Sequence, residues 1–155
     1  MELEQSFLQQ VESVYGKENL ELIEKAFRFA EKKHKGQKRD TGEEYIIHPY
    51  NAAKNLVNCR ADIASVISGF LHDCIEDTDC TPEEIRKNFG DEVYKICLGA
   101  SKIEPIKHAR RKHIEENENL RRMFLTLSKD ARVAFVKLAE RLHNMQTLDI
   151  KSRAN

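Results

Sequence analysis

The sequence predicts an all-α protein with a single domain. Only three prolines and six glycines interrupt its 155 residues, so long stretches are compatible with helices. Runs that alternate apolar and polar residues, the pattern of half-buried strands, are missing, whereas apolar residues recur at helical spacing from end to end. Hydrophobic residues make up 40% of the chain, enough for one core. We therefore expect one domain over residues 1–155, with its core in 18–150.

Charge and composition exclude several classes of protein. Lys plus Arg and Asp plus Glu both number 26, so the chain has no overall positive field to attract nucleic acid. No stretch approaches the roughly 18 consecutive apolar residues of a membrane span. The four cysteines form no C-x-x-C pair and are interpreted as reduced. We expect a cytoplasmic protein without a nucleic-acid or membrane partner.

A first strong helix is predicted from Glu18 to about Lys35. One of its faces is apolar and ends in a histidine; it carries Ile23, Phe27, Ala30 and His34. The basic stretch HKGQKRDTGEEY follows, and its glycines should end the helix. This stretch is the first candidate functional loop.

Two further helices are predicted in the first half of the chain. One begins near His48-Pro49 and runs to about Cys59, since proline is tolerated at a helix start. The next runs from about Ala61 to Ile75 and is apolar enough to cross the core. Its last turns become polar abruptly.

The segment after this polar turn carries a strong helix start. Thr81 can act as the N-cap, followed by proline, with Glu84 three residues after the cap. The short helix should reach Asn88 and end at Gly90, and another should cover residues 92–98. Residues 107–119 are highly charged and form either a solvated helix or a connection.

The last strong helix is predicted from about Lys129 to Leu148 and carries two stripes. The apolar stripe consists of Phe135, Leu138, Leu142 and Met145. The second stripe is rotated from the first and mostly polar; it consists of Val136, Glu140, Asn144 and Thr147.

The polar turn His72-Asp73-x-x-Glu76-Asp77 is the strongest candidate for chemistry. On a continuous helix, His72 lies one turn before Glu76, and Asp73 lies one turn before Asp77. Carboxylates this close repel, and a divalent cation would make the arrangement favourable. The alternative is a solvated helix end. Taken singly, His34 and His48 fit structural roles, and Glu140 fits a surface ion pair.

Six motifs occur in a fixed order along the chain. They are H-K-G-Q-K-R, Y-I-I-H-P, F-L-H-D-C-I-E-D-T, F-G-D-E-V, D-A-R-V and K-L-A-E-R-L-H-N-M-Q-T-L. Together, from about Ala26 to Leu148, they closely resemble the hydrolase domain of the RelA/SpoT alarmone enzymes.

The resemblance implies an HD-domain helical bundle that hydrolyses the 3′-pyrophosphate of (p)ppGpp, giving GDP or GTP and pyrophosphate. It implies one manganese ion held by His48, His72, Asp73 and Glu140. It also implies a catalytic acidic pair, Glu76 and Asp77. The implied contacts to the guanine nucleotide are Arg39, Lys38, Asn144 and Thr147, while His34 supports the site.

The chain departs from the family pattern at position 140. The family pattern reads K-L-A-D-R-L-H-N-M, and Glu140 stands where that aspartate belongs. The longer side chain reaches a shared ion only if the helix, rotamer or metal shifts. Three outcomes stay open: full hydrolysis, slow hydrolysis, or a non-catalytic nucleotide sensor. A phosphatase for another phosphorylated nucleotide is a further alternative.

The end of the chain leaves its organisation open. Long RelA/SpoT-type proteins continue into a synthetase domain, whereas this sequence stops soon after Leu148. The chain is therefore either a small stand-alone hydrolase or a fragment of a longer hydrolase/synthetase protein.

Overall fold

A computed structural model describes residues 2–101 and 130–152, with side chains up to residue 147. Its elements are α1 (Gln5–Tyr15), η1 (Lys17–Asn19), α2 (Leu20–Lys33), α3 (Ile47–Asn58), α4 (Ile63–Leu71), α5 (Cys74–Asp77), α6 (Pro82–Ser101) and α8 (Arg132–Ser152). The described ranges contain no strand beyond one isolated bridge between Lys38 and Glu44. The all-α prediction is confirmed. The charged segment 107–119 lies outside the described residues.

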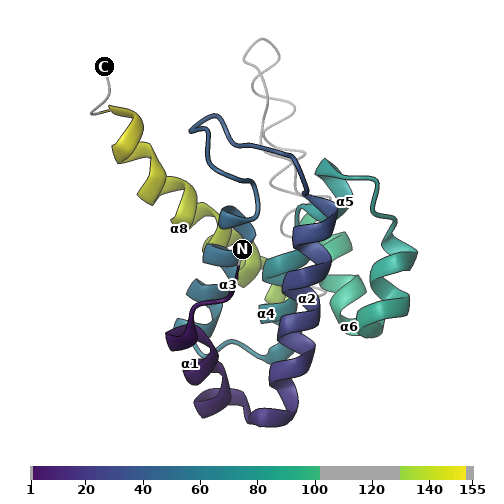
Figure 1. Ribbon diagram of the computed structural model, residues 1–155. Helices are drawn as coiled ribbons and strands as arrows, with labels where there is room; N and C mark the ends of the chain where they lie inside the picture. Colours follow the sequence, from purple (N-terminus) through teal and green to yellow (C-terminus); the bar gives the residue numbers. More distant parts are fainter. Residues whose placement is uncertain (1, 102–129, 153–155) are drawn as a thin grey trace.

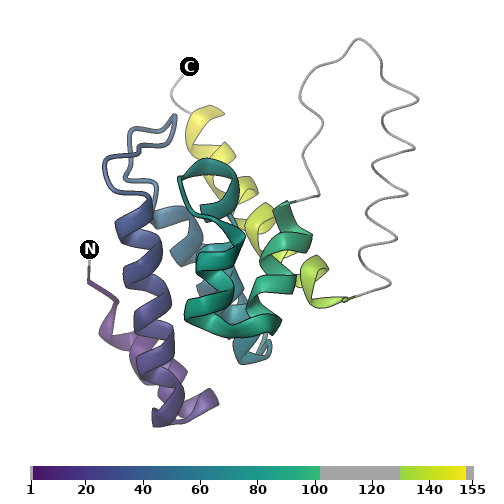
Figure 2. The same ribbon diagram turned by 90° about the vertical axis from the view of Figure 1, so that its right-hand side faces the viewer.

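Helix α4 lies at the centre of the bundle (Figure 1), as its apolar sequence predicts. It packs against α2, α3, α6 and α8, and residues 64–71 are all buried. Figure 2 shows α1 and α2 along one side of the bundle. Within the described ranges, no helix combines the length and hydropathy of a membrane span.

Helices α3 and α4 cross closely at a glycine. A Cβ atom on Gly69 would lie 2.7 Å from Leu56 Cδ1 and 3.1 Å from Ala53 Cα. Because there is no side chain at this point, the two backbones can approach. The crossing brings the start of α3, with His48, toward the end of α4, where His72 follows; the two imidazole centroids are 5.4 Å apart.

The predicted helix from Ala61 to Ile75 is wrong in one respect, because it is divided. Helix α4 ends at Leu71, and the short α5 begins at Cys74. His72 Nδ1 lies 2.9 Å from the Gly69 carbonyl, the acceptor that a continuous helix would offer to the Asp73 N–H. The side chain thus competes with the backbone. Asp77 N still donates to the Asp73 carbonyl at 2.9 Å, so these two residues remain one turn apart.

Helix α6 begins and bends where predicted. Glu84 N donates to Thr81 Oγ1 at 3.3 Å, and Thr81 N donates to Glu84 Oε2 at 2.9 Å. These reciprocal bonds form a capping box. Gly90 has φ 90° and separates two helical stretches within α6, so the predicted break is confirmed.

Helix α8 presents its less hydrophobic side to the domain. Its buried residues are Val133, Val136, Ala139 and His143. The apolar stripe lies on the other side, where Phe135, Leu138, Leu142 and Met145 are 46–64% exposed. The small and β-branched inward residues let α8 pack directly on α3 and α4. This orientation points Glu140 toward the polar turn after α4.

Candidate active site

A polar cavity of about 380 Å³ lies where α3, α5, α8 and the loop between α2 and α3 meet. All the predicted site residues line it except His72 and Thr147. His72 is fully buried beneath it, with a side-chain exposure of 0%. The fold therefore gathers residues that are up to 106 positions apart, from Lys38 to Asn144, around one hollow.

The His72 imidazole has a defined orientation. Nδ1 faces the Gly69 carbonyl, which can only accept a hydrogen bond, so this nitrogen carries the proton. Nε2 is buried and has no hydrogen-bond partner among the described residues, although Asp73 Oδ1 lies 3.0 Å away. A histidine whose second nitrogen is held by a carbonyl is the usual arrangement of a metal ligand.

His48 approaches the same centre from the first turn of α3. Its Nε2 lies 3.5 Å from Asp73 Oδ2. Burial, reinforced by the positive charges that His72 and Arg39 can carry, lowers the pKa of His48 to about 3. A neutral imidazole is the form that binds a metal ion.

Asp73 lies between the two histidines. Burial alone would raise its pKa, but the adjacent His72 outweighs this effect and holds the pKa well below the usual range. The carboxylate is therefore ionised at neutral pH and offers one oxygen toward each imidazole.

Glu140 completes the cluster from α8. Its Oε2 is buried, lies 3.1 Å from Lys137 Nζ in an ion pair, and lies 4.0 Å from His72 Nε2. Ligand atoms of His48, His72 and Glu140 all lie within 4.8 Å of one another. Two ligand atoms, each about 2.1 Å from one ion, can be up to about 4.2 Å apart. His72 Nε2 and Glu140 Oε2, 4.0 Å apart, lie within this limit, so these two side chains could hold one divalent metal ion despite the extra methylene of Glu140.

The acidic pair Glu76 and Asp77 lies on α5, at the wall of the cavity. Burial, together with the charges of Asp73, Asp77 and Glu140, raises the pKa of Glu76, although Lys137 opposes the shift. A carboxylate with a raised pKa is a better general base near neutral pH.

Arg39 ties the loop to α8. Its Nη2 donates to Asn144 Oδ1 at 2.8 Å, and its Nη1 lies 3.1 Å from His48 Nδ1 and 3.2 Å from His143 Nδ1. The predicted nucleotide contacts Arg39, Lys38 and Asn144 thus share the cavity. Thr147 does not line it; its Oγ1 lies 3.0 Å from the Asn144 carbonyl and 3.2 Å from the His143 carbonyl, so its single proton is used within α8.

His34 lies behind the cavity rather than in the cluster. It is 2% exposed, and its Nδ1 lies 2.8 Å from Gln37 Oε1. Nε2 lies 3.7 Å from the Cys74 sulfur. These contacts are consistent with the supporting place that the resemblance implies.

Four residues at the site were not among the sequence-based candidates: Asp40, Tyr45, Lys137 and His143. Tyr45 and His143 lie inside the motifs Y-I-I-H-P and R-L-H-N-M, so a signal for both was present. Lys137 is the partner of Glu140 in the ion pair that the sequence left open as an alternative. The ion pair exists, with Lys137 Nζ 3.1 Å from Glu140 Oε2, but both side chains are only about 20% exposed.

A family model described as an HD domain matches residues 26–155. The chain belongs to the HD domain family. This HD domain is 44% identical over 131 residues to a guanosine-3′,5′-bis(diphosphate) 3′-pyrophosphohydrolase of Aquifex aeolicus, covering 84% of this chain and 18% of the relative. It is 42% identical over 133 residues to a GTP pyrophosphokinase of Myxococcus xanthus, with the same coverage of 84% and 18%.

A solved structure has a similar fold. It is described as a metazoan orthologue of SpoT that hydrolyses ppGpp and plays a role in starvation responses. The TM-score is 0.63 at 25% sequence identity, over 83% of this chain and 70% of that one. These comparisons confirm the predicted all-α HD bundle and the resemblance to the RelA/SpoT hydrolase domain. The chain spans about 18% of the length of the first two relatives, which continue well beyond the matched region.

Proposed function

We propose that this HD domain hydrolyses the 3′-pyrophosphate of (p)ppGpp, releasing pyrophosphate and leaving GDP or GTP, with one manganese ion. The observation that carries the proposal is the cluster of ligand atoms from His48, His72 and Glu140, which lie within 4.8 Å of one another beside a cavity with an acidic wall. The names of the pyrophosphohydrolase relative and of the SpoT orthologue support the substrate.

The proposed ligands are two imidazoles and two carboxylates: His48, His72, Asp73 and Glu140. This mixed nitrogen and oxygen donor set suits manganese as well as other divalent first-row ions. When bound, the ion supplies a Lewis acid that stabilises negative charge on the phosphoryl group.

The acidic pair handles the proton of the attacking water. In the proposed roles, Glu76 accepts the proton because its pKa is raised, and Asp77 orients the water. Attack on the phosphorus next to the 3′ oxygen breaks the bond between them. Pyrophosphate leaves the nucleotide, and the 3′ oxygen takes a proton to become a hydroxyl.

The loop and α8 would bind the nucleotide. Arg39 and Lys38 would offset its negative charge, and Asn144 would contact it from the opposite wall. Thr147, which follows Asn144 on the polar stripe of α8, remains a predicted contact of the nucleotide.

We also propose a cytoplasmic location. Within a longer chain, we propose a synthetase domain as a neighbour of this domain, and the relative named GTP pyrophosphokinase supports this proposal.

The test measures pyrophosphate release from ppGpp by protein loaded with manganese. Wild type should turn over, and Asp73→Asn should abolish turnover because it removes an anionic ligand. Asp79→Asn is the matched control, since the Asp79 side chain is 87% exposed and pairs with Lys33. A folded, metal-loaded wild type that releases no pyrophosphate would refute the proposal.

Glu140 favours a second candidate, a nucleotide sensor that binds without hydrolysis. Binding of ppGpp without turnover in wild type, followed by turnover in Glu140→Asp, would establish this alternative. A panel of other phosphorylated nucleotides tests the remaining alternative, a phosphatase of different specificity.

A further inference from the structure

The side chain of Tyr45 joins the nucleotide-facing loop to both functional aspartates. Its hydroxyl lies 2.5 Å from Asp77 Oδ2 and 3.1 Å from Asp73 Oδ2. A phenol keeps its proton at neutral pH, so the hydroxyl can donate it in a hydrogen bond. One residue thus touches a proposed metal ligand and a member of the proposed catalytic pair.

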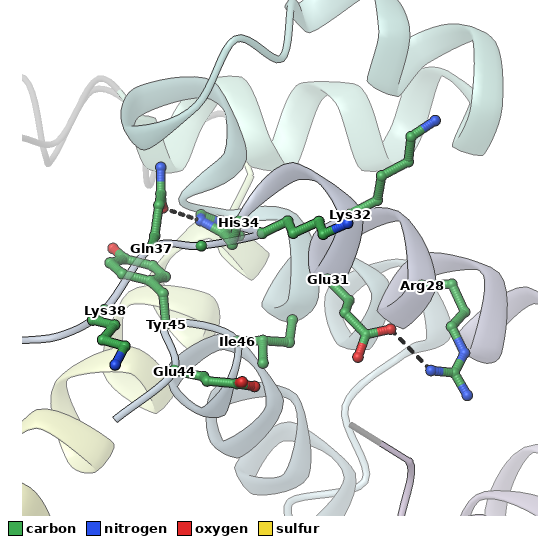
Figure 3. Close-up of a pocket in the computed structure, with 11 residues that line it drawn as sticks. Arg28, Glu31, Lys32, His34, Gln37, Lys38, Glu44, Tyr45 and Ile46 are labelled. Carbon is green, nitrogen blue, oxygen red and sulfur yellow. Dashed lines mark hydrogen bonds and ion pairs between the residues drawn. The ribbon is translucent and has the colours of Figure 1, made fainter. Parts of the chain in front are cut away.

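The ring of Tyr45 is held in place by its neighbours. It stacks on the His34 imidazole with centroids 4.5 Å apart and an angle of 13° between the planes. Figure 3 shows this stacking and the hydrogen bond between His34 and Gln37. Gln37 links Tyr45 to α5 as well. Its backbone carbonyl accepts from Tyr45 N at 3.0 Å, and its side-chain Nε2 donates to the Asp77 backbone carbonyl at 2.6 Å.

Packing behind the loop is incomplete. A second cavity of about 440 Å³ lies on the other side of Tyr45, between the loop and α2, and shares Lys38 and Tyr45 with the first. Side chains of α2 do not fill the space behind the loop at this point. The contacts of Tyr45 and Gln37 therefore hold the loop against α5.

We infer that Tyr45 is a positioning residue for the proposed hydrolysis. A phenol has one proton and can donate it fully to one acceptor at a time. The shorter contact makes Asp77 the main acceptor. This bond occupies Oδ2 of Asp77 and fixes the direction of its other oxygen, while the second contact restrains Asp73. Tyr45 acts through the two aspartates and need not touch the metal ion or the reacting phosphorus.

Tyr45→Phe tests the inference, which rests on the proposed function. The variant keeps the ring that stacks on His34 and removes only the hydroxyl. Loss of an orienting partner typically reduces activity by about 10- to 100-fold, so kcat should fall by this factor while KM changes little. Tyr15→Phe is the matched control, because the Tyr15 hydroxyl donates to the Ala61 carbonyl at 2.7 Å in another part of the fold.

A double variant separates positioning from a merely structural role. Because Asp77 is the main acceptor of the Tyr45 hydroxyl, adding Tyr45→Phe to Asp77→Asn should lower kcat by less than twofold further. If the factors by which the two single substitutions lower kcat multiply in full in the double variant, the inference is overturned.

A crystal structure of Tyr45→Phe keeps the inference testable whatever the substrate. The Asp77 carboxylate should rotate or lose order relative to wild type. Unchanged Asp73 and Asp77 side chains would overturn the inference. A wild type that is inactive on ppGpp, but whose Asp77 moves in the variant, would instead overturn the proposed function alone.

Discussion

Gly69→Ala should loosen the crossing between α3 and α4. The added methyl group would lie 2.7 Å from Leu56 Cδ1, 3.1 Å from Ala53 Cα and 3.2 Å from Ala53 N. The leucine side chain can rotate away, but the other two atoms belong to the backbone of α3. The helices must therefore move apart by several tenths of an ångström.

The size of the effect follows from two opposing contributions. Alanine is a better helix former than glycine by about 1 kcal/mol. Overpacking a filled core typically costs about 1–3 kcal/mol. Because two of the three close contacts at Gly69 are with backbone atoms, the upper part of that range applies. The free energy of unfolding should fall by about 1–2 kcal/mol.

The same displacement should reach the proposed metal site, because the first turn of α3 carries His48 and α4 leads into His72. Manganese affinity should fall roughly tenfold, as it does when the support of a ligand is disturbed. Urea unfolding of metal-free protein measures the stability, and titration calorimetry measures the affinity. Adding Leu56→Val removes one of the three contacts, so it should restore only part of the loss. Unchanged stability together with unchanged affinity would refute the reasoning.

Five further outcomes are expected. Manganese at about 100 times its Kd should raise the free energy of unfolding by about 2.7 kcal/mol, seen as a higher Tm, and Asp73→Asn should remove most of this gain. Glu76→Gln should lower kcat by about 100-fold or more with unchanged manganese affinity, as expected for loss of a general base. Because Glu76 works deprotonated and its pKa is raised, wild-type activity should be present above that pKa and lost as the pH falls through it, so the acid limb of kcat/KM should lie above the ordinary 4.5. Glu140→Gln should weaken manganese binding by at least about tenfold in the same calorimetric assay, whereas equal affinity would show that Glu140 is not a ligand. Thr81→Ala should cost about 1 kcal/mol in urea unfolding without changing turnover, since it removes only a helix cap.

Local patterns predicted most of the helices because the forces that form them are local. The stripe of Ile23, Phe27 and Ala30 predicted α2, and all three residues are buried. Thr81 and Gly90 marked the start and the bend of α6 through capping and positive φ. These features depend on residues a few positions apart, so the sequence contains the information directly.

Two features depend on contacts that spacing does not encode. The break after Leu71 arises because the His72 side chain takes the Gly69 carbonyl, and periodicity alone predicts a continuous helix there. The orientation of α8 is the second. Periodicity identified two stripes on this helix, but the choice of the side carrying Val136 depends on the shape of α3 and α4, against which it packs.

The candidate site was predicted from motifs rather than from physical spacing. Glu140 lies 68 positions after His72, and nothing in the interval indicates that their side chains meet. Only the resemblance to a known hydrolase domain predicted, before the structure, that His72 and Glu140 lie close together. The links made by Tyr45 and Gln37 escaped prediction because they use a hydroxyl and an amide, which have many structural roles.

Arg39 gives the site an evolutionary constraint. The guanidinium that would contact the nucleotide also lies against Nδ1 of His48 and donates a hydrogen bond to Asn144 Oδ1. A replacement that admits a different base or sugar would therefore alter the surroundings of the His48 imidazole, a proposed metal ligand. A substitution of Arg39 would therefore affect substrate choice and metal binding together. New specificities should arise more readily through neighbours such as Lys38, for which no contact with His48 is described.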